Sequence, residues 1–244
     1  MHSIPGTGTL INVAAIILGG LLGMAFGRFL KKEYQEALEK VSGVCVLFLA
    51  IEGVMEEMTH VEGSRLVGGH TMLLIISLVL GTLIGEILEL ERHLEQFGEW
   101  LKKKSGNSGD ARFIDGFVTA SLTVCVGAMA IIGSIQDGIL GDPSTLIAKA
   151  VLDFIIILAM AGSLGKGCVF SAVPVAILQG GVTILSQFIS PLMTEQALSN
   201  ISLTGSVMIF CVGVNLVWGR MLRVANMLPG LIIAAALAFV PFAL

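Results

Sequence analysis

Eight apolar segments, and the charges between them, constrain this chain more than any other feature of its sequence. A hydrocarbon core about 30 Å thick requires about 20 apolar residues per helix. With 55 % apolar residues, 13 % charged residues and a mean hydropathy of +0.92, the chain is too apolar for a soluble domain, where about a quarter of residues are charged. We predict an all-α integral membrane protein, a single polytopic domain over residues 1–244. The predicted transmembrane helices cover about 8–28, 41–57, 70–90, 114–135, 145–164, 171–190, 203–220 and 225–243.

The basic residues predict an orientation. Twelve of the fourteen Lys and Arg residues follow the first, third, fifth and seventh segments: Arg28, Lys31, Lys32, Lys40, Arg92, Lys102, Lys103, Lys104, Arg112, Lys166, Arg220 and Arg223. Short loops rich in Lys and Arg stay in the cytoplasm, so we expect both termini outside it. The net charge is −4 and the basic residues lie in loops, which argues against a nucleic-acid partner.

Two of these basic stretches are amphipathic. Residues 29–40 and 92–104 place apolar side chains at three- and four-residue steps among charged ones, a pattern typical of helices on a membrane surface. Each is either a regulatory, partner-binding helix or a linker that folds on the membrane. The four cysteines lie in or beside apolar segments without C-x-x-C spacing, which argues against a disulfide framework or a zinc site.

Parts of the sequence repeat. Thr9-Leu10-Ile11 and the glycines at 19 and 23 recur sixty-two residues later as Thr71-Met72-Leu73 and the glycines at 81 and 85, and the string 44–53 matches 124–133. A further match joins Cys125-Val126-Gly127 to Cys211-Val212-Gly213 in segments of opposite predicted direction. The first two matches suggest a tandem duplication and the third suggests an inverted repeat, as in many transporters. The Gly-x-x-x-Gly spacing alternatively reflects helix packing or a homodimer.

Charged residues inside apolar segments are functional candidates, because a charge at the bilayer centre costs about 2.5–3.5 kcal/mol on insertion scales. Asp153 stands among apolar residues, one turn after Lys149. It either forms an i, i+4 ion pair with Lys149 or binds a cation or proton. Glu52 either has a similar role or marks the outer end of a short helix.

Several uncharged or terminal polar residues complete the candidate set. Asn12, Gln179 and Asn215 either hydrogen-bond a neighbouring helix or bind substrate. Gln136 and Asp137 either belong to a turn that caps the fourth segment or line a cavity at the outer mouth. Gln179 is followed by two glycines, which permit either a helix break that exposes carbonyl groups or close packing.

Five strings resemble one prokaryotic membrane family, domain of unknown function 554. They are the string at 8–20, the run from 125 to 138, Lys149 to Asp153, Phe170-Ser171-Ala172-Val173-Pro174, and Asn226-Met227-Leu228-Pro229. The resemblance spans nearly the whole chain. It implies a multi-pass inner-membrane protein without an established substrate, and it carries over no catalytic residue.

Three functions fit these observations. The first is a secondary transporter of a small solute or ion across the bacterial inner membrane, with Asp153 as cation or proton site and the amides around it. An oligomeric channel and a non-transporting scaffold are the alternatives. The four histidines form no metal cluster and no hydrolase or phosphate-binding motif occurs, so we expect no enzyme activity, resident metal or cofactor. The expected partners are membrane lipid, a small solute or cation, and a second copy of the chain.

Overall fold

The computed structural model describes residues 4–27, 29, 31–62, 65–107, 109–125 and 128–240. Arg28 and the Val126-Gly127 part of the repeat lie outside these residues. The helices are α1 (Thr7–Gly27), α2 (Lys32–Met58), α3 (Thr71–Leu88), α4 (Leu90–Lys104), α5 (Phe113–Cys125), α6 (Ala128–Leu140), α7 (Ser144–Leu164), α8 (Ala172–Ile184), α9 (Ser186–Ile189), α10 (Glu195–Trp218) and α11 (Pro229–Leu237). Short 3-10 helices precede α8 (η1, Lys166–Ser171), α10 (η2, Ser190–Leu192) and α11 (η3, Val224–Met227).

The chain is a predominantly helical membrane protein, with five helices long and apolar enough to cross a bilayer in the part that the structure describes. They are Thr7–Gly27, Thr71–Leu88, Ser144–Leu164, Lys166–Ile184 and Glu195–Trp218. A sixth span forms if α5 and α6, bent by 62° at their junction, are counted together. The predicted eight spans are therefore not all present as separate long apolar helices.

Three other parts of the chain differ from the helices predicted from the sequence. Residues 29–40 do not form a helix of their own, because α2 continues from Lys32 through the apolar stretch to Met58 without an interrupting proline. The last segment is divided between η3 and the short α11. After α2 comes an antiparallel hairpin of β1 (Thr59–Glu62) and β2 (Arg65–Gly68), which pairs Thr59 with Gly68 and Glu62 with Arg65 and departs from the all-helical prediction.

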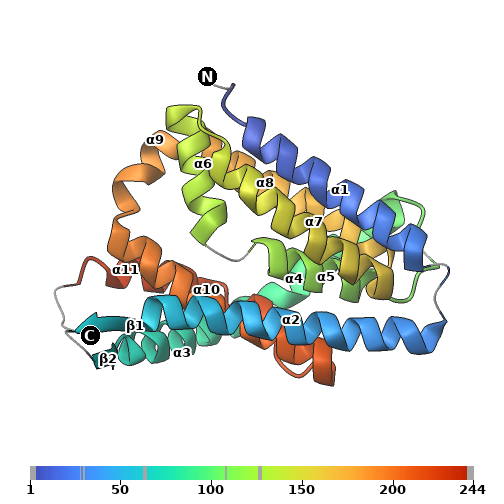
Figure 1. The fold of residues 1–244 in the computed structure, drawn as a ribbon, viewed down its shortest axis with the longest axis horizontal. Coiled ribbons are helices and arrows are strands. Elements are labelled where there is room, and N and C mark those ends of the chain that lie inside the picture. The colour runs from blue at the N-terminus through green and yellow to red at the C-terminus, as the bar shows by residue number, and fades with distance from the viewer. Residues whose placement is uncertain are drawn as a thin grey trace.

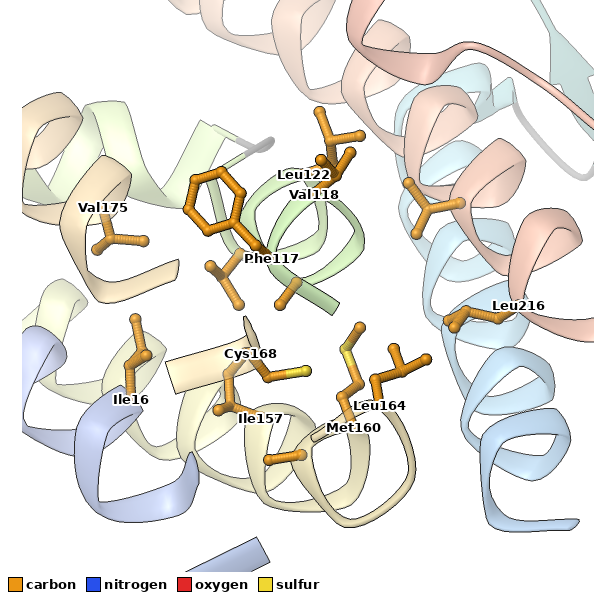
Figure 2. Close-up of a cluster of buried hydrophobic side chains, with 14 of the residues drawn as sticks. Ile16, Phe117, Val118, Leu122, Ile157, Met160, Leu164, Cys168, Val175 and Leu216 are labelled. Atoms are coloured by element: carbon orange, nitrogen blue, oxygen red, sulfur yellow. The ribbon is translucent and has the colours of Figure 1, made fainter. Parts of the chain in front are cut away.

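The helices form two groups with α5 and α4 between them. Figure 1 shows α1, α6, α7 and α8 on one side and α2, α3, α10 and α11 on the other. α5 is buried on nearly all faces, as expected of a helix that is apolar all round. Figure 2 shows its Phe117, Val118 and Leu122 in one cluster of buried side chains with Ile157, Met160 and Leu164 of α7 and Leu216 of α10. Gly98 of α4 rests on Phe117, so the amphipathic helix packs its apolar side against this core.

Glycine contacts fix the relative directions of the helices. Gly8 lies against Leu146 and Gly19 against Phe154, so α1 and α7 run in the same direction. α2 and α10 run in opposite directions, since Gly43 lies against Leu216 while Gly53 lies against Ser206. The glycines of the Gly-x-x-x-Gly motifs meet other helices of the same chain: Gly23 contacts the carbonyl of Leu158, and Gly85 contacts that of Asn226. Close backbone approach of this kind is what small residues permit in lipid.

Candidate functional site

A buried ion pair lies on α7 where that helix packs against α1. Lys149 Nζ is 2.8 Å from both carboxylate oxygens of Asp153, and Asn12 Nδ2 of α1 donates to Asp153 Oδ2 at 3.0 Å. The relative exposures are 8 % for Lys149, 3 % for Asp153 and 0 % for Asn12. The i, i+4 spacing on α7 makes the pair possible, and the glycine face of α1 brings Asn12 against it. Asp153 is therefore held by a cation of its own chain.

Asp137 of α6 is the second fully buried carboxylate of this region. Its Oδ2 accepts the backbone N–H groups of Gly6 (3.1 Å) and Gly8 (3.0 Å), at the start of α1. A carboxylate beside unpaired amides and the positive end of a helix dipole is favourable, so Asp137 caps α1 from another helix. Its Oδ1 is buried without a hydrogen-bond partner among the described residues. The adjacent Gln136 accepts a bond from Thr145 Oγ1 at 2.6 Å, which joins the end of α6 to the start of α7.

Three further buried polar side chains lie on α1 and α8, which pack against α7 and α6 respectively. Thr9 of α1 and Gln179 and Thr183 of α8 are buried, and neither hydroxyl nor either end of the amide has a hydrogen-bond partner in the described part of the chain. Buried polar groups are nearly always hydrogen-bonded, so each exception requires an explanation, such as an ordered water or an ion. We call the whole set the polar core: Thr9, Asn12, Asp137, Lys149, Asp153, Gln179 and Thr183.

Two predicted site residues lie away from the polar core. Asn215 of α10 donates to the carbonyl of Leu222 (2.7 Å) and accepts from the N–H groups of Met221 and Leu222 (both 2.9 Å), so its amide orders the loop that follows α10. Glu52 is exposed on α2. The two glycines after Gln179 do not break α8, which continues to Ile184.

The sequence reading missed Thr9 and Thr183, although a signal was present. Thr9 precedes Asn12 by three residues and Thr183 follows Gln179 by four, so each threonine lies on the same helix face as a selected amide. The sequence also did not predict a role for Cys125 beside the α5–α6 bend. Cys125, at the end of α5, lies within electrostatic range of Lys149 and Asp153. It also lines an apolar cavity of about 310 Å³ between α5, α6, α8, α10 and η3–α11.

The opposite end of the bundle holds a second set of charges, which we call the charged cleft: Glu86, Glu91, Glu95, Arg220, Arg223 and Asn226. They line a cavity of about 620 Å³. Buried Glu91 accepts from Arg220 Nη2 (2.5 Å) and from the N–H of Ala225 (3.2 Å), while its own N–H donates to Asn226 Oδ1 (2.7 Å). Arg220 also reaches Glu95, and Arg223 pairs with Glu86 at 2.9 Å. Partial burial opposes the charge of Arg220, but the hydrogen bonds to Glu91 and Glu95 outweigh it and raise its pKa.

Comparisons with known proteins match nearly the whole chain. The sequence model described as "Protein of unknown function (DUF554)" matches residues 7–239. An uncharacterized membrane protein of Bacillus subtilis (strain 168), YdfK, is 27 % identical over 233 residues, which is 96 % of each chain. An uncharacterized protein of Escherichia coli (strain K12), YqgA, is 28 % identical over 239 residues, 95 % of each chain. No solved structure gives a significant match.

Proposed function

The chain belongs to the DUF554 family, and we propose that it is a secondary transporter of a small solute or ion in which the Asp153–Lys149 pair is the coupling switch. One observation carries the proposal: an ion pair buried in the bundle beside several polar atoms that have no partner among the described residues. Ionisable residues inside a membrane are costly and usually belong to ion pathways or proton relays. Stability alone does not require such a pair, because apolar residues of similar volume often replace a buried ion pair without loss of stability.

The geometry supports a competition mechanism. Lys149 Nζ occupies the position in front of both Asp153 oxygens, where a proton or a metal cation would bind. A cation that reaches Asp153 releases the ammonium of Lys149, and loss of that cation lets the pair form again. The two states differ in the charge and contacts of α7, so binding shifts the equilibrium between them.

One structural feature favours alternating access over a permanent pore. The 62° bend between α5 and α6 lies next to Cys125, within range of the ion pair and beside the apolar cavity. Discontinuous helices at such positions are common in transporters with inverted repeats. The proposed inverted repeat pairs 114–135 with 203–220, and both termini are proposed to lie outside the cytoplasm of an inner membrane.

The alternatives make different predictions. A channel conducts without saturation, whereas a transporter saturates. A scaffold would dock partners on the amphipathic helices, but Leu94 and Phe97 of α4 already pack against the core of their own chain. A homodimer is compatible with each function, although the Gly-x-x-x-Gly faces are used within the chain.

Proton movement in proteoliposomes tests the proposal. Vesicles with an internal pH-sensitive dye are given an inward gradient of Na⁺ or K⁺, with choline as the inert cation. Wild type is expected to move protons with saturable dependence on one cation, and Asp153→Asn and Lys149→Gln are each expected to reduce the rate at least tenfold. Asp142→Asn is the matched control, because that carboxylate is exposed, lies outside the polar core and accepts the N–H of Ser144.

Unchanged proton movement in both core variants would overturn the switch, and currents without saturation would favour the channel. The C-terminal orientation is checked with an alkaline phosphatase fusion, which is active only outside the cytoplasm.

A further inference from the structure

The charges of the polar core do not balance. Two carboxylates, Asp137 and Asp153, face one ammonium, Lys149, and that ammonium contacts both oxygens of Asp153. Asp137 is fully buried and has no cationic side chain beside it among the described residues. The two N–H groups that it accepts both bind Oδ2. Within the described part of the chain, this buried negative charge is thus stabilised by backbone dipoles alone, on one of its two oxygens.

Asp137 lies between α1 and α8, two helices that carry buried hydroxyls without partners among the described residues. Gly8 packs so closely that a Cβ at this position would lie 3.2 Å from Asp137 Oδ2, and a Cβ at Gly138 would lie 2.6 Å from the carbonyl of Thr183. The Asp137–Gly138 step therefore fits between the start of α1, next to Thr9, and α8 at Thr183. Both threonine hydroxyls and Asp137 Oδ1 are buried without a partner in the described chain.

The amides form the next layer toward the ion pair. α8 runs antiparallel to α1. Val169 of η1, which precedes α8, lies against Gly20, whereas Thr183 near the end of α8 lies by Gly138, next to the carboxylate that binds the N–H of Gly8. With a rise of about 1.5 Å per residue, Asn12 and Thr9 come level with about 177–180 on α8, around Gln179. Thr183 comes level with Gly6, whose N–H binds Asp137. Asn12 Oδ1 and Gln179 Oε1 also lack hydrogen bonds to described residues.

We propose that Asp137, Thr9 and Thr183, with Gln179 and Asn12 below them, bind a monovalent alkali cation. Oxygen atoms are the ligands that hard cations prefer, and the five unpartnered oxygens outnumber the single unpartnered amide NH₂. A monovalent ion cancels the one uncompensated charge, whereas a divalent ion would leave a buried positive charge and an anion would add to the negative one. This site adds a cation-binding position to the proposed transporter. Only the role of the cation as the coupling ion rests on the proposed transport function.

Binding of ²²Na⁺ to the detergent-purified full chain, measured by scintillation proximity with K⁺, Li⁺ and choline as competitors, tests the site directly. Wild type is expected to bind saturably, with competition by at least one alkali cation and none by choline. Asp137→Asn is expected to weaken Na⁺ binding at least tenfold. Asp142→Asn is the control, because it removes the same charge from an exposed carboxylate five residues away and should leave binding unchanged.

Thr9→Val and Thr183→Val keep the test decisive if Asp137→Asn does not fold. Neither hydroxyl has a hydrogen bond in the described chain, so valine of the same shape removes a ligand and breaks no contact. Each is expected to weaken binding severalfold. The proposal is overturned if wild type shows no saturable binding of any of these cations, or if all three core variants bind like wild type.

The two proposals fail separately. Saturable Na⁺ binding that depends on Asp137, in a protein whose proton movement ignores Asp153 and Lys149, upholds this site and overturns the transport switch. Intact coupled flux without Na⁺, K⁺ or Li⁺ binding overturns this site and leaves the switch in place.

Discussion

The polar core and the charged cleft both join helices through carboxylates, yet they sit in different surroundings. In the polar core the side chains of Lys149 and Asp153 are 10 % and 4 % exposed. In the charged cleft Arg220 is 48 % exposed although its partner Glu91 is 6 % exposed. The first pair is removed from water and meets the full cost of desolvation, while the second keeps one partner in water, where salt screens it.

The comparison separates two uses of charge in one protein. Glu91 accepts from a guanidinium and from the backbone of η3, so the charged cleft fastens α4 to the loop after α10. The polar core joins α1 to α7 and α6, but it leaves six of its side-chain atoms without partners among the described residues. Contacts that only join helices need no unpartnered oxygens, whereas a site that binds a cation needs oxygens that are free to contact it.

The largest effect is expected from breaking the buried pair on one side only. Asp153→Leu leaves Lys149 charged and unpaired, which should cost about 3–5 kcal/mol of unfolding free energy. The double variant Lys149→Met/Asp153→Leu should recover most of this loss, since similar apolar volume replaces both charges, but should remain inactive in the proton assay. The measurement is thermal unfolding in detergent. A double variant no more stable than Asp153→Leu would refute the charge argument.

Local spacing explains which parts of this picture the sequence could predict. The i, i+4 relation of Lys149 and Asp153 is a property of a single helix, so the sequence predicts the ion pair as one of two interpretations of Asp153. The bond from Asn12 joins residues 141 positions apart, and the bonds of Asn215 depend on how the loop after α10 folds back. The sequence predicts two helices, 29–40 and 41–57, where the structure has the single helix α2, because the first turns of α2 are polar and the rest is apolar. That change in polarity alters burial but does not interrupt a helix.

A smaller effect is expected from the glycines that bring each region together. Gly23→Ala places a methyl group against the carbonyl of Leu158 between α1 and α7, and Gly85→Ala places one against Asn226 beside the charged cleft. Backbone atoms cannot rotate away, so each should cost about 1–3 kcal/mol, as overpacking does. Gly180→Ala is the matched control, because nothing lies within 4 Å of its Cβ position and alanine favours the helix. Equal melting temperatures for all three variants would contradict the close packing.

In the charged cleft, Glu91→Gln tests whether salt screens the ion pair of Glu91 with half-exposed Arg220. The variant loses the charge that binds Arg220 but keeps an oxygen for the N–H of Ala225, so we expect a loss of about 1–2 kcal/mol. The loss should shrink in 0.5 M salt, unlike that of Asp153→Leu. Arg92→Gln is the control, since its pair with Glu89 is exposed on both sides and should contribute little. Thermal unfolding at low and high salt distinguishes the regions, and a salt-independent loss at Glu91 would remove the distinction.

The smallest effect is expected at Asp142, the exposed counterpart of Asp137 at the start of a helix. The backbone N–H of Ser144 donates to Asp142 Oδ1 at 3.0 Å, and this bond lowers the pKa of Asp142. Because the folded pKa lies below the unfolded value of about 3.9, the carboxylate stabilises the fold above that value and ceases to do so as pH falls through the folded pKa. Asp142→Asn should therefore lower the melting temperature slightly at pH 7, with the difference shrinking below about pH 4 and disappearing below the folded pKa. Melting curves from pH 7 to pH 3 measure it, and a difference that grows toward acid would give the shift the opposite sign.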